Sequence, residues 1–360
     1  MKTRLSHNSR GMALIMAMIA IFVLSALAAG FAISMKVETR LAQNAGSEQQ
    51  LLWAGRSGME LARYVLSQQL TIPSEPYDAL NQIWAGGPGG IDSSNSALSG
   101  LSLSHYQIDD EVWVEVKIID LERKANINTA NAAAIQQALT LMGVDASEIS
   151  VVSDSILDWI DPGDDPGLGG AESDYYQGLA VPYYAKNAPI DDLAELLLIK
   201  GVTPEMYWGS NSTNHIPSVF QHKLGLGHAP GQTPDYPFGL VDLFTPISGG
   251  RININTADAN VLQMIPGVDA ATAENIIKQR AGPDGAEGTE DDTPFRNVSQ
   301  LAATGLSPQF VSQIGNLCTV RSLAFEVHVT AHIGDYQREY VATLFRNSGT
   351  DIKVLGFYWK

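Results

Sequence analysis

The chain opens with its longest apolar run. The first eleven residues carry Lys2, Arg4 and Arg10 and no acid, whereas residues 12–33 carry neither charge nor proline. A helix of that length spans roughly 33 Å, enough to cross a bilayer core of about 30 Å. Because basic residues precede the run, the pattern predicts a membrane anchor with a cytoplasmic N-terminus and a body outside the cytoplasm after Lys36.

Helical spacing continues beyond this segment. From Val37 to about Leu70 there is no proline, and apolar residues recur at helical intervals: Leu51, Leu52, Met59, Leu61, Ala62, Val65 and Leu66. We therefore expect one helix of more than about 50 residues, ended by Pro73 and Pro76. Its first half is apolar all round and its second half is amphipathic.

Strict alternation of apolar and polar residues predicts strands in two distant parts of the chain. Residues 106–121 alternate around Val112, Val114, Val116 and Ile118, with Trp113 on the other face. Near the C-terminus, 325–332, 338–346 and 352–359 form a predicted meander with turns at Gly334-Asp335 and Ser348-Gly349. The pattern predicts one antiparallel sheet interrupted by a long helical segment.

That helical segment contains a repeat. The sequence NINTA at 126–130 recurs at 253–257 and is followed in both copies by an apolar helix and then by GVDA at 143–146 and 267–270. A second helix, an acidic loop and a short helix ending in glycine follow, at 190–201 and 295–305. Thr129 and Thr256 are the predicted helix caps.

The second copy also resembles a helix-hairpin-helix, a module that grips DNA phosphates through backbone amides. Asp269 stands where the module usually has a small residue and would repel phosphate. The formal charge of the chain is −17, and removal of the three basic residues before Met12 takes it to −20. Since such a charge opposes nucleic-acid binding, we interpret the hairpins as packing units and expect no nucleic-acid partner.

Two glycine-rich acidic loops carry the candidate chemistry. The second has hard oxygen donors closely spaced at Asp284, Glu287, Thr289, Asp291 and Asp292. Ca²⁺ needs six to eight such oxygens and tolerates irregular geometry, so this loop is the favoured calcium site. The first loop is a weaker candidate, because its acids also suit a solvated turn; its residues are Asp161, Asp164, Asp165, Glu172 and Asp174.

Catalytic motifs are absent from the sequence. It contains no G-x-S-x-G, H-E-x-x-H or P-loop pattern, and the histidines are scattered, so we expect no enzyme activity. Only His328 and His332 share a strand face, where a two-histidine metal site is an alternative to plain exposure. Cys318, the one cysteine, cannot form an intramolecular disulfide and is a predicted core residue.

Arg10-Gly11 before Met12-Ala13-Leu14-Ile15 resembles a type IV prepilin cleavage site. The resemblance implies that prepilin peptidase cuts after Gly11 and that Met12 becomes a methylated N-terminus. A signal peptide cut at the small residues 28–30 is the alternative, but the apolar run continues into a helix without a break. Pilin-like proteins usually have Glu at the fifth mature residue, where this chain has Met16. The missing carboxylate suits a special position at a fibre end.

The block from Asp158 to Tyr207, with Tyr175-Tyr176, Pro182-Tyr183 and Asn187-Ala-Pro-Ile190, resembles the type II secretion minor pseudopilin K (GspK) family. The resemblance implies an α+β fold, in which a long N-terminal helix packs on an antiparallel sheet that carries an inserted α-helical domain with duplicated hairpin units. We expect a leader (1–11), a transmembrane and fibre-core helix (12–33), a pilin-like first part (34–121), the helical insert (122–245) and a pilin-like second part (246–360).

The family resemblance also implies a function. The protein would be a structural subunit that caps and helps initiate the periplasmic pseudopilus, in a heterotrimeric tip complex with two smaller minor pseudopilins and with calcium bound. It would be anchored once in the inner membrane of a Gram-negative-type envelope, with its body in the periplasm. Secreted proteins and the outer-membrane channel are further partners that the sequence leaves open. The alternatives are a DNA-binding minor pilin and a membrane-anchored periplasmic enzyme.

Overall fold

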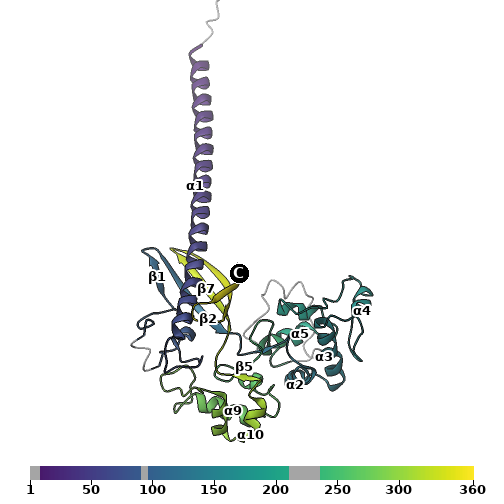
Figure 1. Ribbon diagram of the computed structural model, residues 1–360. Coiled ribbons are helices and arrows are strands. Elements are labelled where there is room, and N and C mark those ends of the chain that lie inside the picture. Colours follow the sequence, from purple (N-terminus) through teal and green to yellow (C-terminus); the bar gives the residue numbers. More distant parts are fainter. Residues whose placement is uncertain (1–8, 91–95, 211–235) are drawn as a thin grey trace, which may run out of the picture.

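The structure, a computed structural model, describes residues 9–90, 96–210 and 236–360, and for residues 9–11 and 42–45 it describes the backbone alone. Most of the predicted leader, residues 1–8, lies outside this range. Figure 1 shows a long helix that rises from a twisted sheet, with two groups of short helices on the far side of the sheet from the helix tip. The predicted α+β class, with a long helix on an antiparallel sheet, is confirmed.

Helix α1 (Ser9–Gln69) runs for 61 residues, as the unbroken helical pattern predicts. Its C-terminal part buries one apolar face against the sheet, at Leu51, Ala54, Ala62, Val65 and Leu66. Its N-terminal part, the purple segment in Figure 1, contacts nothing else in the described chain. The N-terminal half of the helix is therefore exposed, and its C-terminal half is packed against the sheet.

Two glycines allow α1 to approach the sheet closely. A Cβ built on Gly55 would lie 2.4 Å from the Tyr340 ring, and one on Gly58 would lie 2.4 Å from Val329 Cγ1. Neither distance is compatible with a side chain, so both glycines are required by packing. Their cost to helix propensity, about 1 kcal/mol each, is offset by this contact.

The main sheet has the strand order β1-β2-β7-β8-β9, and every pair is antiparallel. Its strands are β1 (Tyr106–Asp109), β2 (Val112–Asp120), β7 (Ala324–Ile333), β8 (Tyr336–Arg346) and β9 (Ile352–Trp359). The C-terminal meander is confirmed. The single strand predicted over 106–121 is wrong, because the chain turns at Asp110, whose amide donates to Asp109 Oδ1 (2.8 Å), and forms a hairpin.

The strands β2 and β7 pair along their whole length although about 200 residues separate them, so 121–323 form an insertion, here called the helical lobe. The 3₁₀ turn η1 (Ile83–Ala85) belongs to the pilin-like part, and the described helices that follow it belong to the lobe. They are α2 (Ala132–Met142), α3 (Ala146–Ile160), α4 (Ser173–Gln177), η3 (Leu193–Leu198), α5 (Pro204–Trp208), α7 (Leu240–Leu243), α8 (Ala259–Leu262), α9 (Ala270–Arg280), η4 (Val298–Thr304) and α10 (Pro308–Ile314).

The sequence repeat is a structural repeat. In the first copy, β3 (Ala125–Asn126) pairs in parallel with β4 (Phe244–Thr245), and in the second, β5 (Ile252–Asn253) pairs in parallel with β6 (Cys318–Thr319). The first asparagine of each NINTA segment thus ends the first strand of a unit, and that strand pairs with the last strand of the same unit. Buried residues of both units form one continuous apolar cluster, which extends from Ile127 to Cys318 and spans the expected boundary at 245/246.

The predicted threonine caps are wrong. The residue two positions later caps each helix: Asn131 Oδ1 accepts from the Ala134 amide (2.9 Å), and Asp258 Oδ1 accepts from the Val261 amide (2.9 Å). Thr256 instead donates its hydroxyl to Asp120 Oδ2 (2.5 Å), a residue of the sheet. Thr256 therefore links the helical lobe to the main sheet and does not cap its own helix.

Candidate functional site

The first candidate site is the exposed N-terminal half of α1. From Met12 to Leu41 its large apolar side chains are about half to three-quarters exposed, and Phe22 is 75% exposed. Among the described residues α1 is the one helix long and apolar enough to cross a membrane. Gly11 and Met12 lie inside the helix at this exposed end, and Met16 is also exposed. Such a surface requires an apolar surrounding, which the other described residues do not supply.

The second candidate site is the acidic loop after α9, which the structure shows tightly turned on itself. Thr289 Oγ1 lies 2.8 Å from Asp291 Oδ1, 3.2 Å from Asp292 Oδ1 and 3.2 Å from the Ala286 carbonyl oxygen. The hydrogen bond from Thr289 lowers the pKa of Asp291, so this carboxylate is ionised at neutral pH. Asp284 joins the group through its amide, which donates to Asp291 Oδ2 (3.0 Å).

Four of the five predicted ligands in this loop are thus brought together, and the fifth is not. Glu287 turns away and accepts a hydrogen bond from Arg280, which is 3% exposed and also donates to the Ile254 carbonyl (2.7 Å). The gathered atoms are hard oxygens of carboxylates, a hydroxyl and a carbonyl, which fit Ca²⁺. Glu287 serves a buried guanidinium instead. Within the described parts of the chain, no three His, Cys, Asp or Glu side chains converge as a preformed metal cage.

The first acidic loop, between α3 and α4, is built differently. Asp158, which is 5% exposed on α3, accepts from the Gly167 amide with both carboxylate oxygens (3.1 Å each). Of the predicted ligands, Asp161, Asp164, Asp165 and Asp174 are exposed, and Asp161 and Asp164 bond to Gly163 and Asn187 respectively. Glu172 alone is buried. Burial, followed by the charge of Asp158, raises its pKa to about 7.

A buried polar joint connects the sheet to the helical lobe, and sequence reasoning missed it. Arg346 donates to Asp78 and to the Ser322 carbonyl (2.8 Å), and both of these charged side chains are almost fully buried. Asp120 Oδ2 accepts from Ser322 (2.7 Å) and Asn253 (3.0 Å), and burial raises its pKa. No sequence signal marks these residues, because the partners are far apart in the chain.

Glu122 completes this joint at the entrance to the lobe. Its carboxylate accepts from the amides of Gly249 (2.6 Å), Leu323 (2.9 Å) and Ala324 (3.0 Å) and so holds together both ends of the lobe. Burial, together with the charge of Asp120, raises the pKa of Glu122 to about 8. The joint is a rigid, hydrogen-bonded connection rather than a reactive centre.

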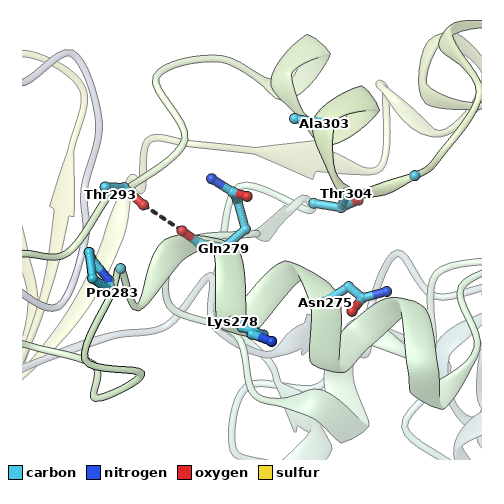
Figure 2. Close-up of a pocket in the computed structure, with 9 residues that line it drawn as sticks. Asn275, Lys278, Gln279, Pro283, Thr293, Ala303 and Thr304 are labelled. Carbon is cyan, nitrogen blue, oxygen red and sulfur yellow. Dashed lines mark hydrogen bonds between the residues drawn. The ribbon is translucent and has the colours of Figure 1, made fainter.

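A polar groove of about 730 Å³ lies beside α9, and Figure 2 shows its lining. Asn275, Lys278 and Gln279 of α9 face Thr304 across it, and Pro283 begins the acidic loop at its edge. Lys278 is the one charged side chain among the described residues of the lining, which include no acid, cysteine or histidine. The hairpin before it has Gly267 against Phe310 and Asp269 as the N-cap of α9. Both contacts are packing features.

The two histidines of β7 do not share a ligand. His328 lies between two acids, with Nε2 2.7 Å from Glu326 Oε1 and Nδ1 2.8 Å from Glu339 Oε1. His332 stacks on Trp113 at a centroid distance of 3.8 Å. The Glu326 hydrogen bond raises the pKa of His328, whereas burial lowers that of His332. Their different partners favour separate structural roles.

Comparison with known proteins finds consistent similarity to one family. A family model described as type II secretion system (T2SS), protein K matches residues 115–209, and a helix-hairpin-helix motif model matches residues 248–318. Type II secretion system protein K of Pseudomonas aeruginosa is 24% identical over 97% of this chain and 92% of its own length. The chain is a relative of type II secretion system protein K.

Further matches are also to protein K. The protein K of Pectobacterium carotovorum is 29% identical over 76 residues, which are 21% of this chain and 23% of that protein. A chain in the crystal structure of the GspK-GspI-GspJ complex from the type 2 secretion system of enterotoxigenic Escherichia coli covers 89% of this chain with a TM-score of 0.59 and 18% identity. That match, which includes 99% of the other chain, shows a shared fold. The first acidic loop falls in the protein K segment and the second in the helix-hairpin-helix segment.

Proposed function

We propose that this protein is a minor pseudopilin of the type II secretion system that caps the periplasmic pseudopilus and helps initiate it. The observation that carries the proposal is α1, one continuous helix with an apolar, exposed N-terminal half and a C-terminal half packed on a sheet. The exposed half is long enough to stand in the inner membrane and later in the core of a fibre. The similarity to protein K supports the type II secretion system as the system in which the protein acts.

Two features favour the end of the fibre over its shaft. The helical lobe makes the body much broader than a helix on a small sheet, as Figure 1 shows, and such breadth obstructs a following subunit. In addition, Met16 stands where a shaft subunit would have the carboxylate that recruits the next N-terminus. A subunit without that carboxylate begins or ends a fibre but does not extend it.

The partners we propose are two smaller minor pseudopilins. The structural relative comes from a complex of GspK with GspI and GspJ, and this chain shares its fold. Prepilin peptidase would act first, cutting after Gly11 on the cytoplasmic face of the membrane. Secreted proteins or the outer-membrane channel would then meet the helical lobe, the part that lies farthest from the anchor in Figure 1.

We also propose that the loop after α9 binds calcium through Asp284, Thr289, Asp291 and Asp292. The carboxylates of Asp291 and Asp292 already lie at Thr289 Oγ1, and the Asp284 amide donates to Asp291, whose carboxylate is ionised and exposed. A bound cation would neutralise repulsion among these acids and fix the loop, a structural role with no catalytic step. In this fit Glu287 stays with Arg280.

The proposed function is tested by mass spectrometry of the mature N-terminus, on protein isolated from native membranes. We expect cleavage after Gly11 and a methyl group on Met12. The matched variant Gly11→Leu should block cleavage and abolish secretion, whereas Gly30→Leu should be cut normally, because no atom lies within 4 Å of a Cβ at that position. An intact Met1, or a cut near Gly30, would overturn the pseudopilin assignment.

A further inference from the structure

The last strand of the main sheet, β9, has a free edge. In the strand order β1-β2-β7-β8-β9 it lies at one end, and among the described residues it pairs with β8 alone. In Figure 1, β1 and the C-terminal end of the chain mark the two opposite edges of the sheet. A free edge presents unpaired backbone amides and carbonyls, which can pair with a strand of another chain.

The two edges of the sheet differ in how they are protected. β1 has four residues and leads into a run of acids at 109–111, the short and charged form that natural edge strands use against unwanted pairing. β9 has eight residues, and its large side chains Leu355, Tyr358 and Trp359 are each more than half exposed. A bulge at Leu355 interrupts the pairing with β8, so the regular half of β9 begins at Gly356. This half of the second edge is left open.

The backbone of β9 shows which groups point outwards. The Lys360 amide donates to the Glu339 carbonyl of β8 (3.0 Å), and the amides of an antiparallel ladder alternate in direction. Those of Phe357 and Trp359 therefore point away from β8, and no described residue accepts a hydrogen bond from them. Two outward amides at a spacing of two residues match one edge of an extended polypeptide.

Side-chain contacts hold this half of β9 in place. The Phe357 ring stacks on Tyr340 of β8 at a centroid distance of 5.4 Å and an interplanar angle of 3°. The Arg338 guanidinium carbon lies 5.1 Å from the centre of the Trp359 ring. Because these contacts order the strand before a partner arrives, binding costs little conformational entropy. Trp359 thus presents a rigid aromatic surface, of the kind that dominates the energy of many interfaces.

Charge restricts the chemistry of a partner. Residues 352–360 contain Lys353 and Lys360 and no acid, in a chain whose formal charge is −17. Asp351, the residue before β9, already accepts a hydrogen bond from Asn347 (2.8 Å). A partner strand with acidic residues would meet the lysines with the opposite charge, whereas a second copy of β9 would bring lysines of its own.

The position of β9 along α1 disfavours a membrane as the occupant. Trp359 pairs with Tyr340, whose ring packs against Gly55 of α1. At 1.5 Å per helical residue, Gly55 lies roughly 28 Å along α1 from Lys36, where the apolar run has ended. A bilayer that surrounds the apolar half of an upright α1 therefore does not reach the edge strand.

We propose that β9 is a strand-addition site, at which another protein adds an extended segment along residues 356–359. The segment has apolar side chains at alternate positions, which pack beside Phe357 and Trp359, and acidic residues toward its ends. Backbone hydrogen bonds to the outward amides supply affinity, and the exposed aromatic residues and the lysines supply specificity. The site is separate from both acidic loops and does not depend on the proposed function.

The test uses the full-length protein in detergent and a blocked peptide in which valine and threonine alternate between two terminal glutamates. N-methyl groups on alternate residues leave the peptide one pairing edge, so that it cannot stack on itself. We expect saturable binding, and hydrogen exchange at the Phe357 and Trp359 amides should slow by at least about tenfold. Exchange at the Tyr358 amide, which points to β8, should change by less than about twofold.

Two tryptophans provide a matched pair of variants. Trp359 and Trp53 are 66% and 58% exposed, and each lies against an arginine, at 5.1 Å and 5.2 Å. Trp359→Ala should weaken peptide binding by at least about tenfold, whereas Trp53→Ala on α1 should leave it within about twofold. Thermal unfolding checks that both variants are folded, and the hydrogen exchange of the parent decides independently of either.

Three results would overturn the proposal. The first is unchanged exchange at Phe357 and Trp359 with about 1 mM peptide present. The second is slow exchange at these amides in lipid nanodiscs without peptide, which would identify the membrane as the occupant. The third is a dimer of the protein that Trp359→Ala dissociates, which would identify a second copy of the chain.

Discussion

Asn255 and Phe295 exchange two hydrogen bonds across the second repeat. The Asn255 amide nitrogen donates to the Phe295 carbonyl (2.9 Å), and the Phe295 amide donates to Asn255 Oδ1 (2.8 Å). In the first repeat, Asn128 holds Ile190 in the same two-bond way, at 2.9 Å and 2.7 Å. The last asparagine of NINTA therefore fixes the start of the short helix that closes each unit.

Replacement of Asn255 by alanine should destabilise the protein strongly. Asn255 and Phe295 are 2% and 3% exposed, so the variant leaves a buried amide and a buried carbonyl without partners. We expect a loss of about 2 to 4 kcal/mol in the free energy of unfolding and a Tm lower by roughly 3 to 5 °C. Asn128→Ala is the matched control. The Asn128 side chain is only half-buried, so water replaces part of the loss and the decrease should be smaller. Equal effects would contradict this explanation.

Replacing Gly46 or Gly58 of α1 by alanine should change the free energy of unfolding in opposite directions. Gly46 has no atom within 4 Å of a Cβ, so Gly46→Ala should stabilise the helix by up to about 1 kcal/mol. Gly58→Ala would push a methyl group into Val329 and should cost about 1 to 3 kcal/mol despite the better helix propensity. Urea unfolding in detergent measures both. A gain at Gly58 would show that α1 packs on the sheet less closely than described.

The periodicity of apolar residues and the internal sequence repeat were enough to predict most of the architecture. The long helix, the C-terminal meander and the duplication all follow from local patterns in the sequence. The threonine caps failed because Thr256 has a partner, Asp120, that is 136 residues away. The Asp78–Arg346 pair was invisible for the same reason, since 268 residues separate its members. Likewise, the acids of both loops were found from composition. Their surroundings depend on tertiary contacts, which pair Glu287 with Arg280 and bury Glu172 while the other predicted acids of its loop stay exposed.

The two histidines of β7 should have pKa values on opposite sides of 6.5. The hydrogen bond to Glu326, with that to Glu339, favours protonated His328 over the opposing effect of burial. Its pKa should therefore exceed 6.5, and that of the stacked, partly buried His332 should fall below it, as NMR titration of the two ring signals would measure. The reverse order would contradict the assigned contacts.

The same contacts set a pH dependence of stability. Because the folded-state pKa of His328 is raised, its contribution is complete below about 6.5 and is lost as the pH rises through the folded-state value. His328→Gln should remove this loss, seen as a flatter plot of Tm against pH above neutrality. His332→Gln should change the pH dependence of stability on the acidic side of 6.5. It should remove a loss of stability that begins as the pH falls below about 6.5.

Substitutions in the loop after α9 should separate structural from metal-binding acids. Glu287→Gln leaves the buried Arg280 without its counter-charge and should lower the Tm equally with and without calcium. Asp291→Asn should lower the Tm in calcium and leave it nearly unchanged after chelation, because Asp291 is fully exposed. Melting curves in calcium and in chelator measure both. A calcium-dependent effect of Glu287→Gln would return that residue to the ligand set.

The helical lobe leaves the sheet and returns to it at neighbouring positions. Leu121 donates its amide to the Ala324 carbonyl (3.0 Å), and Asp120 is paired with Phe325. A turn of a few residues between these two points would complete the same five-stranded sheet, so the sheet places no limit on the size of what lies between them. The lobe is in this sense a module whose length the sheet does not fix, provided that the lobe residues that donate to the buried Asp120 and Glu122 are kept.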